Sequence, residues 1–198
     1  MAGLLRLATE DDAEGMLEIY AQVVEETVIS FEEQPPSPQE FRSRIRTVLD
    51  RLPWLVCVFG DDLAGYAYAT PFRSRAGYRW SVELTVYVHP NYHRRGVARS
   101  LYTALLRCLE AQGYHTAVAL IALPNQASTA LHAAMGFRRT GVLESIGYKH
   151  GRWINDDVWQ LTIQPAPGAP SEPIPLSQFI GTREWQEALD SGTALLKT

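Results

Sequence analysis

Hydrophobic residues recur every three or four positions in several stretches of the chain, and this spacing predicts helices. The first helix is expected after Thr9 and Asp12, which have the spacing of a capping box; its apolar positions are Ala13, Met16, Ile19, Tyr20 and Val23. The same periodicity predicts helices over residues 38–49, 96–112 and 126–135. A glycine follows each of the last two, as is common at helix C-termini.

Other stretches alternate between apolar and polar residues, which predicts strands. The clearest is residues 79–88, where Val82 and Leu84 face one way while Glu83 and Thr85 face the other. Residues 116–122 are almost continuously apolar, so this strand is expected to be buried on both faces. Further strands are expected at residues 4–8, 54–59, 63–70, 137–143 and 158–163. This order of elements indicates a mixed sheet of the α+β or α/β class.

The composition changes after Ile163. Residues 164–175 contain five prolines and are expected to form an extended linker. Residues 179–196 have room for one short amphipathic helix. The predicted organisation is therefore one domain over residues 1–163, followed by a Pro-rich C-terminal extension over residues 164–198.

Composition and charge narrow the classes of function. A chain of 198 residues buries roughly 70% of its unfolded surface, which suffices for a core without disulfides. The net charge of −4 argues against nucleic acid or an anionic membrane as the main partner. Cys57 and Cys108 are interpreted as reduced, buried thiols, since neither has the local signature of a nucleophile. With no spanning run and no secretory segment, a cytoplasmic location is expected.

The segment that indicates chemistry joins the strand ending at Val88 to the helix that begins near Gly96. A short basic turn before a helix directs backbone N–H groups into one concavity, next to the positive end of the helix dipole. Gly96 and Ala98 allow close approach of the backbone, and three arginines add charge: Arg94, Arg95 and Arg99. The pattern predicts an anion site for a pyrophosphate, against the alternative of a solvated basic turn.

His93-Arg94-Arg95-Gly96-Val97-Ala98 resembles the coenzyme A pyrophosphate loop of the GNAT acetyltransferase superfamily, Q/R-x-x-G-x-G/A, although His93 departs from the usual Gln or Arg. Further blocks resemble the phosphinothricin N-acetyltransferase group and run in order from about residue 4 to 163: residues 31–35, 78–88, 101–106, 109–113, 123–125 and 147–153. The resemblance implies a GNAT fold, in which helices flank the central sheet on both faces, and acetyl-CoA as the cofactor.

Acetyl transfer to an amine requires a base, stabilisation of the carbonyl oxygen and a proton or dipole for the departing thiolate. Glu83 is the candidate base, because partial burial on its strand would raise its pKa, and the resemblance places the catalytic glutamate there. His132, at a position where many GNAT enzymes have a tyrosine acid, is the second catalytic candidate. The alternatives without a catalytic role are that Glu83 is an exposed carboxylate on a strand and that His132 is packed on a helix.

The resemblance also implies the residues that bind the coenzyme. Strand residues pair with pantetheine through their backbone, and Asn125 hydrogen-bonds it, unless this side chain only caps a helix. The predicted coenzyme contacts are Val86, Tyr87, Val88, His93, Arg94, Arg95, Gly96, Val97, Ala98, Arg99, Ser100, Asn125 and Ser128.

The acceptor is expected to be a small amino acid with acidic ends, because arginine forks suit carboxylates and phosphinates. The predicted contacts are Phe31, Arg73, Arg75, Tyr78 and Thr85, with Lys149 as a further candidate. No metal is predicted. The resemblance implies N-acetylation of phosphinothricin, methionine sulfoximine or methionine sulfone by a homodimer, through direct transfer in a ternary complex. The alternatives are a peptide or protein N-acetyltransferase of the same fold and a non-catalytic coenzyme A-binding module.

Overall fold

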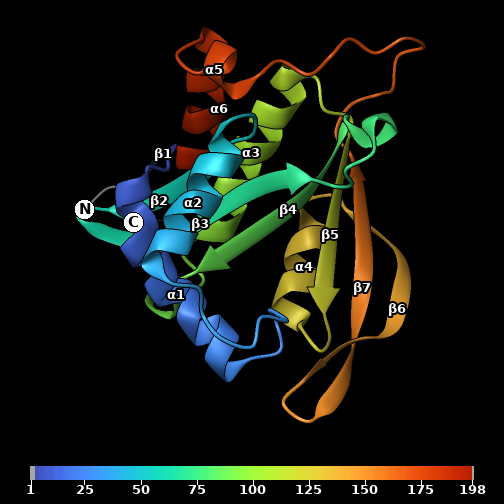
Figure 1. Ribbon diagram of the computed structural model, residues 1–198. Helices are drawn as coiled ribbons and strands as arrows, with labels where there is room; N and C mark the ends of the chain where they lie inside the picture. The colour runs from blue at the N-terminus through green and yellow to red at the C-terminus, as the bar shows by residue number, and fades with distance from the viewer. Residues whose placement is uncertain (1–2, 198) are drawn as a thin grey trace.

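The computed structural model describes residues 3–197, which form one seven-stranded sheet in the order β1-β2-β3-β4-β5-β7-β6 (Figure 1). The β4–β5 pair is parallel, and the other neighbouring strands are antiparallel. The strands are β1 (Gly3–Leu7), β2 (Trp54–Phe59), β3 (Asp62–Pro71), β4 (Ser81–Val88), β5 (Thr116–Ala122), β6 (Arg138–Lys149) and β7 (Arg152–Thr162). The α-helices are α1 (Ala13–Glu26), α2 (Pro38–Leu49), α3 (Val97–Gln112), α4 (Gln126–Ala134), α5 (Leu176–Phe179) and α6 (Arg183–Thr193).

Helices cover both faces of the sheet, which confirms the expected α+β architecture (Figure 1). Helices α1 and α2 pack on one face around Met16, Ile45 and Trp54. Helix α3 packs on the other face with its predicted apolar stripe, and α4 adds partly buried side chains to the same cluster. The stripe is completely buried and consists of Val97, Leu101, Leu105 and Leu109.

The two central strands separate in the middle of the sheet. Strand β4 pairs with β5 only through Ser81, Val82 and Glu83, although β4 continues to Val88. Beyond Glu83, the edge of β4 that faces β5 has no neighbouring strand among residues 3–197. Unpaired strand edges carry free N–H and C=O groups, so this opening presents a row of hydrogen-bonding positions in the interior of the molecule.

The β6–β7 hairpin is longer than the sequence predicts. The expected strands at residues 137–143 and 158–163 are the far ends of two strands that meet at the turn His150-Gly151. Both turn residues have positive φ, of 50° and 76°, as a two-residue hairpin turn requires. The polar run Asn155-Asp156-Asp157 hides the strand pattern in β7, because two of its three side chains are buried despite their charge.

The C-terminal extension also differs from the expectation. It contains the single-turn helix α5 as well as α6, and its prolines run in an extended segment that is fastened to the domain. Trp80 Nε1 donates a hydrogen bond to Ser171 O at 2.7 Å, and Ile174 N donates to Gln112 O at 2.8 Å. Helix α6 then lies along α3 and near β1, and its buried residues belong to the main core (Figure 1).

Candidate active site

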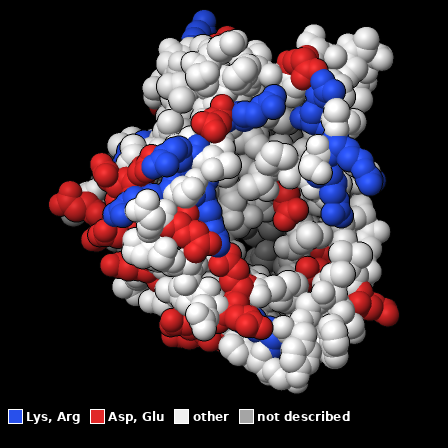
Figure 2. Space-filling model, in the orientation of Figure 1, with Lys and Arg blue, Asp and Glu red and all other residues white. Residues whose placement is uncertain are grey.

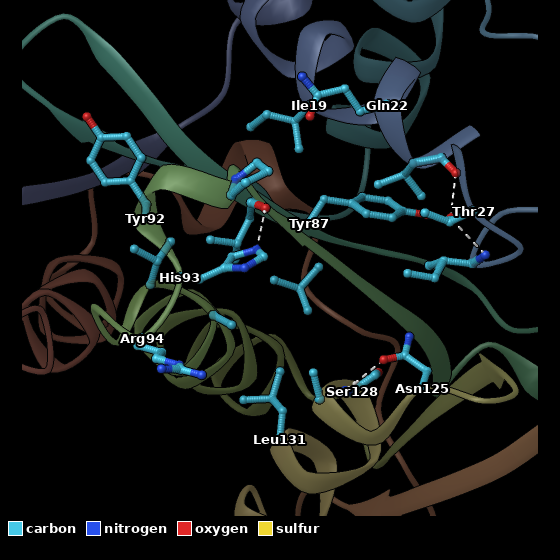
Figure 3. Close-up of a pocket in the computed structure, with 18 of the residues that line it drawn as sticks. Ile19, Gln22, Thr27, Tyr87, Tyr92, His93, Arg94, Asn125, Ser128 and Leu131 are labelled. Atoms are coloured by element: carbon cyan, nitrogen blue, oxygen red, sulfur yellow. Dashed lines mark hydrogen bonds between the residues drawn. The ribbon is translucent and has the colours of Figure 1, made fainter. Parts of the chain in front are cut away.

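The larger cavity, of about 710 Å³, lies beside the part of β4 that does not pair with β5. In Figure 3 the labelled residues His93 and Arg94 lie at one end, Asn125 and Ser128 at the other, and Tyr87 lies between them. The cavity is lined by the free half of β4, the turn before α3, the first turns of α3 and α4, and one face of α1. Of the predicted coenzyme contacts, those that line it are Val86, Tyr87, Val88, His93, Arg94, Gly96, Val97, Ala98, Arg99, Asn125 and Ser128.

The turn before α3 has the geometry of an anion-binding loop. Arg94 and Gly96 both have positive φ, 63° and 83°, and a turn with such residues gathers successive backbone N–H groups into a concavity. His93 Nε2 lies 3.2 Å from Val88 O, which ties the turn to the end of β4. The positive end of the α3 dipole adjoins this concavity. The arrangement suits a phosphate or pyrophosphate group.

Two predicted coenzyme contacts, Arg95 and Ser100, do not line this cavity. Ser100 is fully buried, and its Oγ donates a hydrogen bond to Gly192 O at 2.8 Å, so its side chain faces α6. The Arg95 guanidinium lies over the rings of Phe59 and Tyr92, 5.6 and 5.4 Å from their centroids, and does not line the cavity. Ser100 therefore contacts the C-terminal extension, and Arg95 packs against Phe59 and against Tyr92, which itself lines the cavity.

Gly96 is required for a reason that the sequence does not reveal. Its φ of 83° disfavours any other residue, and a Cβ atom there would lie 2.7 Å from Leu195 O. A side chain at this position would therefore collide with the backbone of the C-terminal extension. Lys197 N also donates a hydrogen bond to Arg95 O at 3.0 Å, so the extension holds the turn at two adjacent residues.

A smaller cavity, of about 270 Å³, adjoins the larger one and shares Ile29, Val86, Tyr87, Asn125 and Ser128 with it. Its walls come from β4, β5, β7, α3, α4 and the loop after α1. Both catalytic candidates, Glu83 and His132, line it. The shared walls place the larger cavity directly beside the one that contains these two side chains.

Burial shifts the pKa of Glu83 in the direction expected of a base. Desolvation on β4 raises the pKa of this carboxyl above its ordinary value, and the negative charge of Asp156 raises it further. The nearby guanidinium of Arg73 acts in the opposite direction but does not cancel the shift. A carboxylate with a raised pKa is a better proton acceptor at neutral pH.

His132 lies on α4, is 3% exposed and is joined to Tyr102 of α3. Its Nδ1 lies 2.8 Å from Ser128 O, and a carbonyl only accepts, so Nδ1 carries the hydrogen. Burial lowers the pKa of His132, which keeps the ring neutral and leaves Nε2 as an acceptor. The Tyr102 hydroxyl therefore donates to Nε2, across 3.2 Å. The result is a buried, oriented Tyr102–His132 pair at the wall of the smaller cavity.

The predicted acceptor residues divide into two groups. Phe31 and Thr85 line the smaller cavity, and the Phe31 ring lies against Gly147, where a Cβ would come within 2.5 Å of it. Arg73, Arg75 and Tyr78 are exposed and line neither cavity, although Arg73 is close enough to lower the pKa of Glu83.

Lys149 is not available to an acceptor. Its Nζ is buried and donates to Val24 O and Ser30 O at 2.6 Å each. Burial lowers the pKa of this amine. Lys149 therefore positions the loop that carries Phe31, and the prediction that it binds an acidic end needs correction.

Sequence reasoning missed several residues of the two cavities. Tyr102 lay in a helix with an apolar stripe and read as core. Asp156 lay in a polar run outside the predicted strand. Leu120 breaks the expected two-sided burial of β5, since it is 41% exposed and lines the smaller cavity. The α1 face also went unnoticed, because its apolar positions resemble core positions and its polar positions resemble surface positions. The residues of α1 that line the larger cavity are Ile19, Gln22, Val23 and Glu26, and Thr27 follows them.

The face drawn in Figure 2 is hollowed, with acidic side chains beside the hollow and basic ones along part of its margin. Within residues 3–197, no group of three His, Cys, Asp or Glu side chains has the arrangement of a metal site. Nor does that part of the chain contain a helix both long and apolar enough to cross a membrane. The site therefore combines a half-buried carboxyl, a neutral imidazole and a turn suited to phosphate.

Comparison with known proteins agrees with this arrangement. Residues 5–159 match the acetyltransferase (GNAT) domain family. The chain is 40% identical to a phosphinothricin N-acetyltransferase of Streptomyces viridochromogenes, over 86% of this chain and 93% of that protein. It is 32% identical to an L-methionine sulfoximine/L-methionine sulfone acetyltransferase of Pseudomonas aeruginosa, over 86% of this chain and 100% of the relative.

A solved structure extends the likeness to three dimensions. The GNAT superfamily phosphinothricin acetyltransferase of Sinorhizobium meliloti, solved in complex with acetyl-CoA, is 33% identical and superposes with a TM-score of 0.82. The match covers 88% of this chain and 96% of that structure. The family match, the relatives and the shared fold together lead to one conclusion: the chain belongs to the GNAT acetyltransferase family.

Proposed function

We propose that the protein is an acetyl-CoA-dependent N-acetyltransferase acting on the free amine of a small glutamate-like amino acid, such as phosphinothricin, methionine sulfoximine or methionine sulfone. The observation that carries the proposal is the position of Glu83, a half-buried carboxyl with a raised pKa in a small cavity that adjoins a larger one suited to a phosphate-bearing ligand. The names of the relatives supply the chemical class of the acceptor.

The larger cavity has the features that coenzyme A requires. The turn around Arg94 would hold the pyrophosphate through backbone N–H groups, with the α3 dipole behind it. The free edge of β4 would pair with the pantetheine arm. Asn125 caps α4 through Oδ1, which accepts from Ser128 N at 3.1 Å, and its amide NH₂ remains available at the cavity wall. When bound, acetyl-CoA supplies an acetyl group activated as a thioester.

The acceptor would bind in the smaller cavity. Glu83 would take a proton from the acceptor ammonium, which frees the nitrogen lone pair to form the new C–N bond as the C–S bond breaks. The nitrogen loses a second proton once the C–N bond has formed. The neutral His132 Nε2, which accepts from the Tyr102 hydroxyl in the free enzyme, would take up that proton and pass it to the departing thiolate. The net products are the amide, the free thiol and one proton.

Direct transfer is preferred to a covalent acetyl-enzyme. Cys57 and Cys108 are fully buried in the main core and line neither cavity. Burial raises the pKa of each thiol to about 12, so neither forms a thiolate readily. Buried free thiols also suit a reducing compartment, and we propose a cytoplasmic location on that basis.

We also propose that residues 1–163 form the catalytic domain, with residues 164–198 as an extension that supports the coenzyme turn, and that the protein is a homodimer. The dimer proposal draws on large apolar side chains exposed on the β6–β7 hairpin. Sedimentation of the wild type and of the double variant Ile146→Glu/Trp153→Glu tests it, and a monomeric wild type would contradict it. The exposed side chains are Val142, Leu143, Ile146, Tyr148 and Trp153.

The test of the function is thiol release from acetyl-CoA across a panel of acceptors. The panel contains phosphinothricin, methionine sulfoximine, methionine sulfone, the common amino acids, polyamines and N-terminal peptides. Turnover on the first three is the expected result, since a cavity of about 270 Å³ suits a small acceptor. Turnover on peptides alone would replace the acceptor class, and coenzyme binding without any turnover would favour a non-catalytic module.

A further inference from the structure

Asp156 is a buried carboxyl with no assigned role. It lies on β7, is 6% exposed, and its Oδ1 has no hydrogen-bond partner among residues 3–197. The adjacent Asp157 is equally buried but satisfied, because Arg139 donates to its Oδ1 across 2.7 Å. An unpaired buried carboxylate oxygen is costly, so Asp156 is expected to meet a donor that comes from outside the chain.

Asp156 lines the smaller cavity together with Glu83 and His132. Its register partner on β5 is Ala122, which also lines that cavity. Its charge acts on Glu83, since it contributes to the raised pKa of that carboxyl. The acceptor cavity therefore contains two carboxyl groups from different strands, close enough to interact, in a wall that is otherwise formed largely by apolar and hydroxyl side chains.

We propose that Asp156 is a specificity residue for the acceptor: its carboxylate accepts a hydrogen bond from the acceptor amine and holds that nitrogen beside Glu83. The inference rests on the proposed function, because it assigns the second group that contacts the same amine. A primary ammonium has three N–H donors. Glu83 takes one proton, Asp156 accepts a hydrogen bond from an N–H that is not transferred to Glu83, and the freed lone pair points toward the larger cavity. Asp156 itself receives no proton in this role.

Selectivity follows from the two charges. A protonated primary amine satisfies both carboxylates, whereas an acceptor without the amine leaves Asp156 unpaired and places uncharged atoms between two anions. The site is thus expected to reject desamino analogues even when their acidic ends fit. The acidic groups of the acceptor need a positive partner, which neither carboxylate can supply. Arg73 is the candidate, because its charge already acts on Glu83.

The test compares the wild type with Asp156→Asn, which preserves shape and removes the charge. In Asp156→Asn the KM for phosphinothricin should rise about tenfold to hundredfold, the range expected when a hydrogen bond to a charged group is lost. The KM for acetyl-CoA should stay within about twofold, because the lost hydrogen bond is to the acceptor and not to the coenzyme. Asp157→Asn is the matched control: the same change one residue away, outside both cavities, should leave the acceptor KM unchanged.

The pH profile provides a readout that simple loss of packing would not move. Without the charge of Asp156 the pKa of Glu83 falls, so the acidic limb of kcat/KM should move to lower pH. The other titratable groups that interact with Glu83 or share its cavity are unchanged in the variant; they are Arg73, His132, Tyr68, Tyr87 and Tyr102. The desamino analogue, used as a competitive inhibitor, should bind more tightly to Asp156→Asn than to the wild type.

Each outcome bears on the inference. An active wild type with unchanged acceptor KM and pH profile in Asp156→Asn would overturn it alone. A wild type inactive on every amine of the panel would overturn the proposed function and this inference with it. Melting temperatures show whether the variant is folded, and Asp156→Ser replaces it if it is not. Should both variants unfold, tight inhibition of the wild type by the desamino analogue would contradict the inference, and weak inhibition would support it.

Discussion

At the scale of single residues, burial shifts the pKa of Glu83 up and that of His132 down. The two shifts share one cause, since a less polar environment disfavours whichever form is charged. Burial therefore brings the pKa of Glu83 closer to neutral pH and moves that of His132 away from it, which keeps the imidazole neutral and able to accept a proton. Substitution of each side chain tests the role that its shifted pKa indicates.

Glu83→Gln should lower kcat by roughly a hundredfold to ten-thousandfold, the usual contribution of a positioned general base. The affinity for acetyl-CoA should be unchanged, because Glu83 does not line the larger cavity. In the wild type, activity requires the ionised carboxylate and a raised pKa, so the acidic limb should lie above the ordinary glutamate range. Steady-state rates and calorimetric coenzyme binding measure both effects, and equal turnover would remove Glu83 as the base.

His132→Phe tests the buried imidazole through stability as well as catalysis. Since the folded protein lowers the pKa of His132, the unfolded chain binds a proton first, and stability is lost as pH falls below about 6.5. The variant should lack this part of the acid dependence. Urea unfolding at pH 7.5 and at pH values below about 6.5 measures this dependence. The variant His150→Phe, at an exposed position, is the control. An identical pH–rate profile would return His132 to a packing role.

At the scale of elements, the turn between β4 and α3 depends on two left-handed residues and on support from behind. Arg94 can adopt positive φ only at some cost, and Gly96 adopts it freely. The turn was visible in the sequence as a basic segment before a helix. Its support by Leu195 and Lys197 was not, because those residues lie about a hundred positions away and contact it only in the folded chain.

Gly96→Ala should raise the KM for acetyl-CoA and lower stability by about 1–2 kcal/mol, from the strain of positive φ. A further loss comes from the 2.7 Å approach of the new Cβ to Leu195 O. Gly151→Ala is the matched control, since Gly151 also has positive φ, at 76°, with no atom within 4 Å of its Cβ position. It should lose stability without a change in coenzyme KM. Equal coenzyme KM values for both variants would contradict the role of the turn.

At the scale of the whole molecule, the C-terminal extension completes the core. Trp185 and Leu189 of α6 belong to the same cluster as the α3 stripe, and Gly192 allows α6 to approach α3 closely, since a Cβ there would lie 2.6 Å from Ser100 O. The extension lies outside the matched family domain, which ends at residue 159. Its packing makes the coenzyme turn depend on residues that the family match does not include.

Trp185→Ala should lower the free energy of unfolding by about 3–5 kcal/mol, the range for removing a buried tryptophan side chain. It should also raise the KM for acetyl-CoA, because α6 supports the helix that follows the turn. Ile180→Ala, in the same extension but 42% exposed, should leave both quantities nearly unchanged. Denaturant unfolding and coenzyme kinetics measure the pair. A stable, fully active Trp185→Ala would show that the extension is dispensable.

The prediction from sequence succeeded where a property is local. The α3 stripe follows from spacing, since side chains three or four apart share a helix face, and β5, at residues 116–122, follows from its continuous apolar run. The basic turn and Glu83 on its strand were also recognisable. Resemblance to a family supplied the role of each, which spacing alone did not.

The predicted contacts that lie outside both cavities share a physical cause. Ser100, Arg95 and Lys149 were assigned from their place in a motif. In the folded chain, Ser100 donates a hydrogen bond to α6, Arg95 lies over Phe59 and Tyr92, and Lys149 donates to the end of α1. In the sequence, the polar run around Asp156 resembles a surface segment, and the position of Tyr102 resembles a core position. The chain by itself determined the elements, the sheet class and the turn, because these depend on neighbouring residues. Only the tertiary structure decided which side chains face the two cavities, because burial and partners are set by segments distant in sequence.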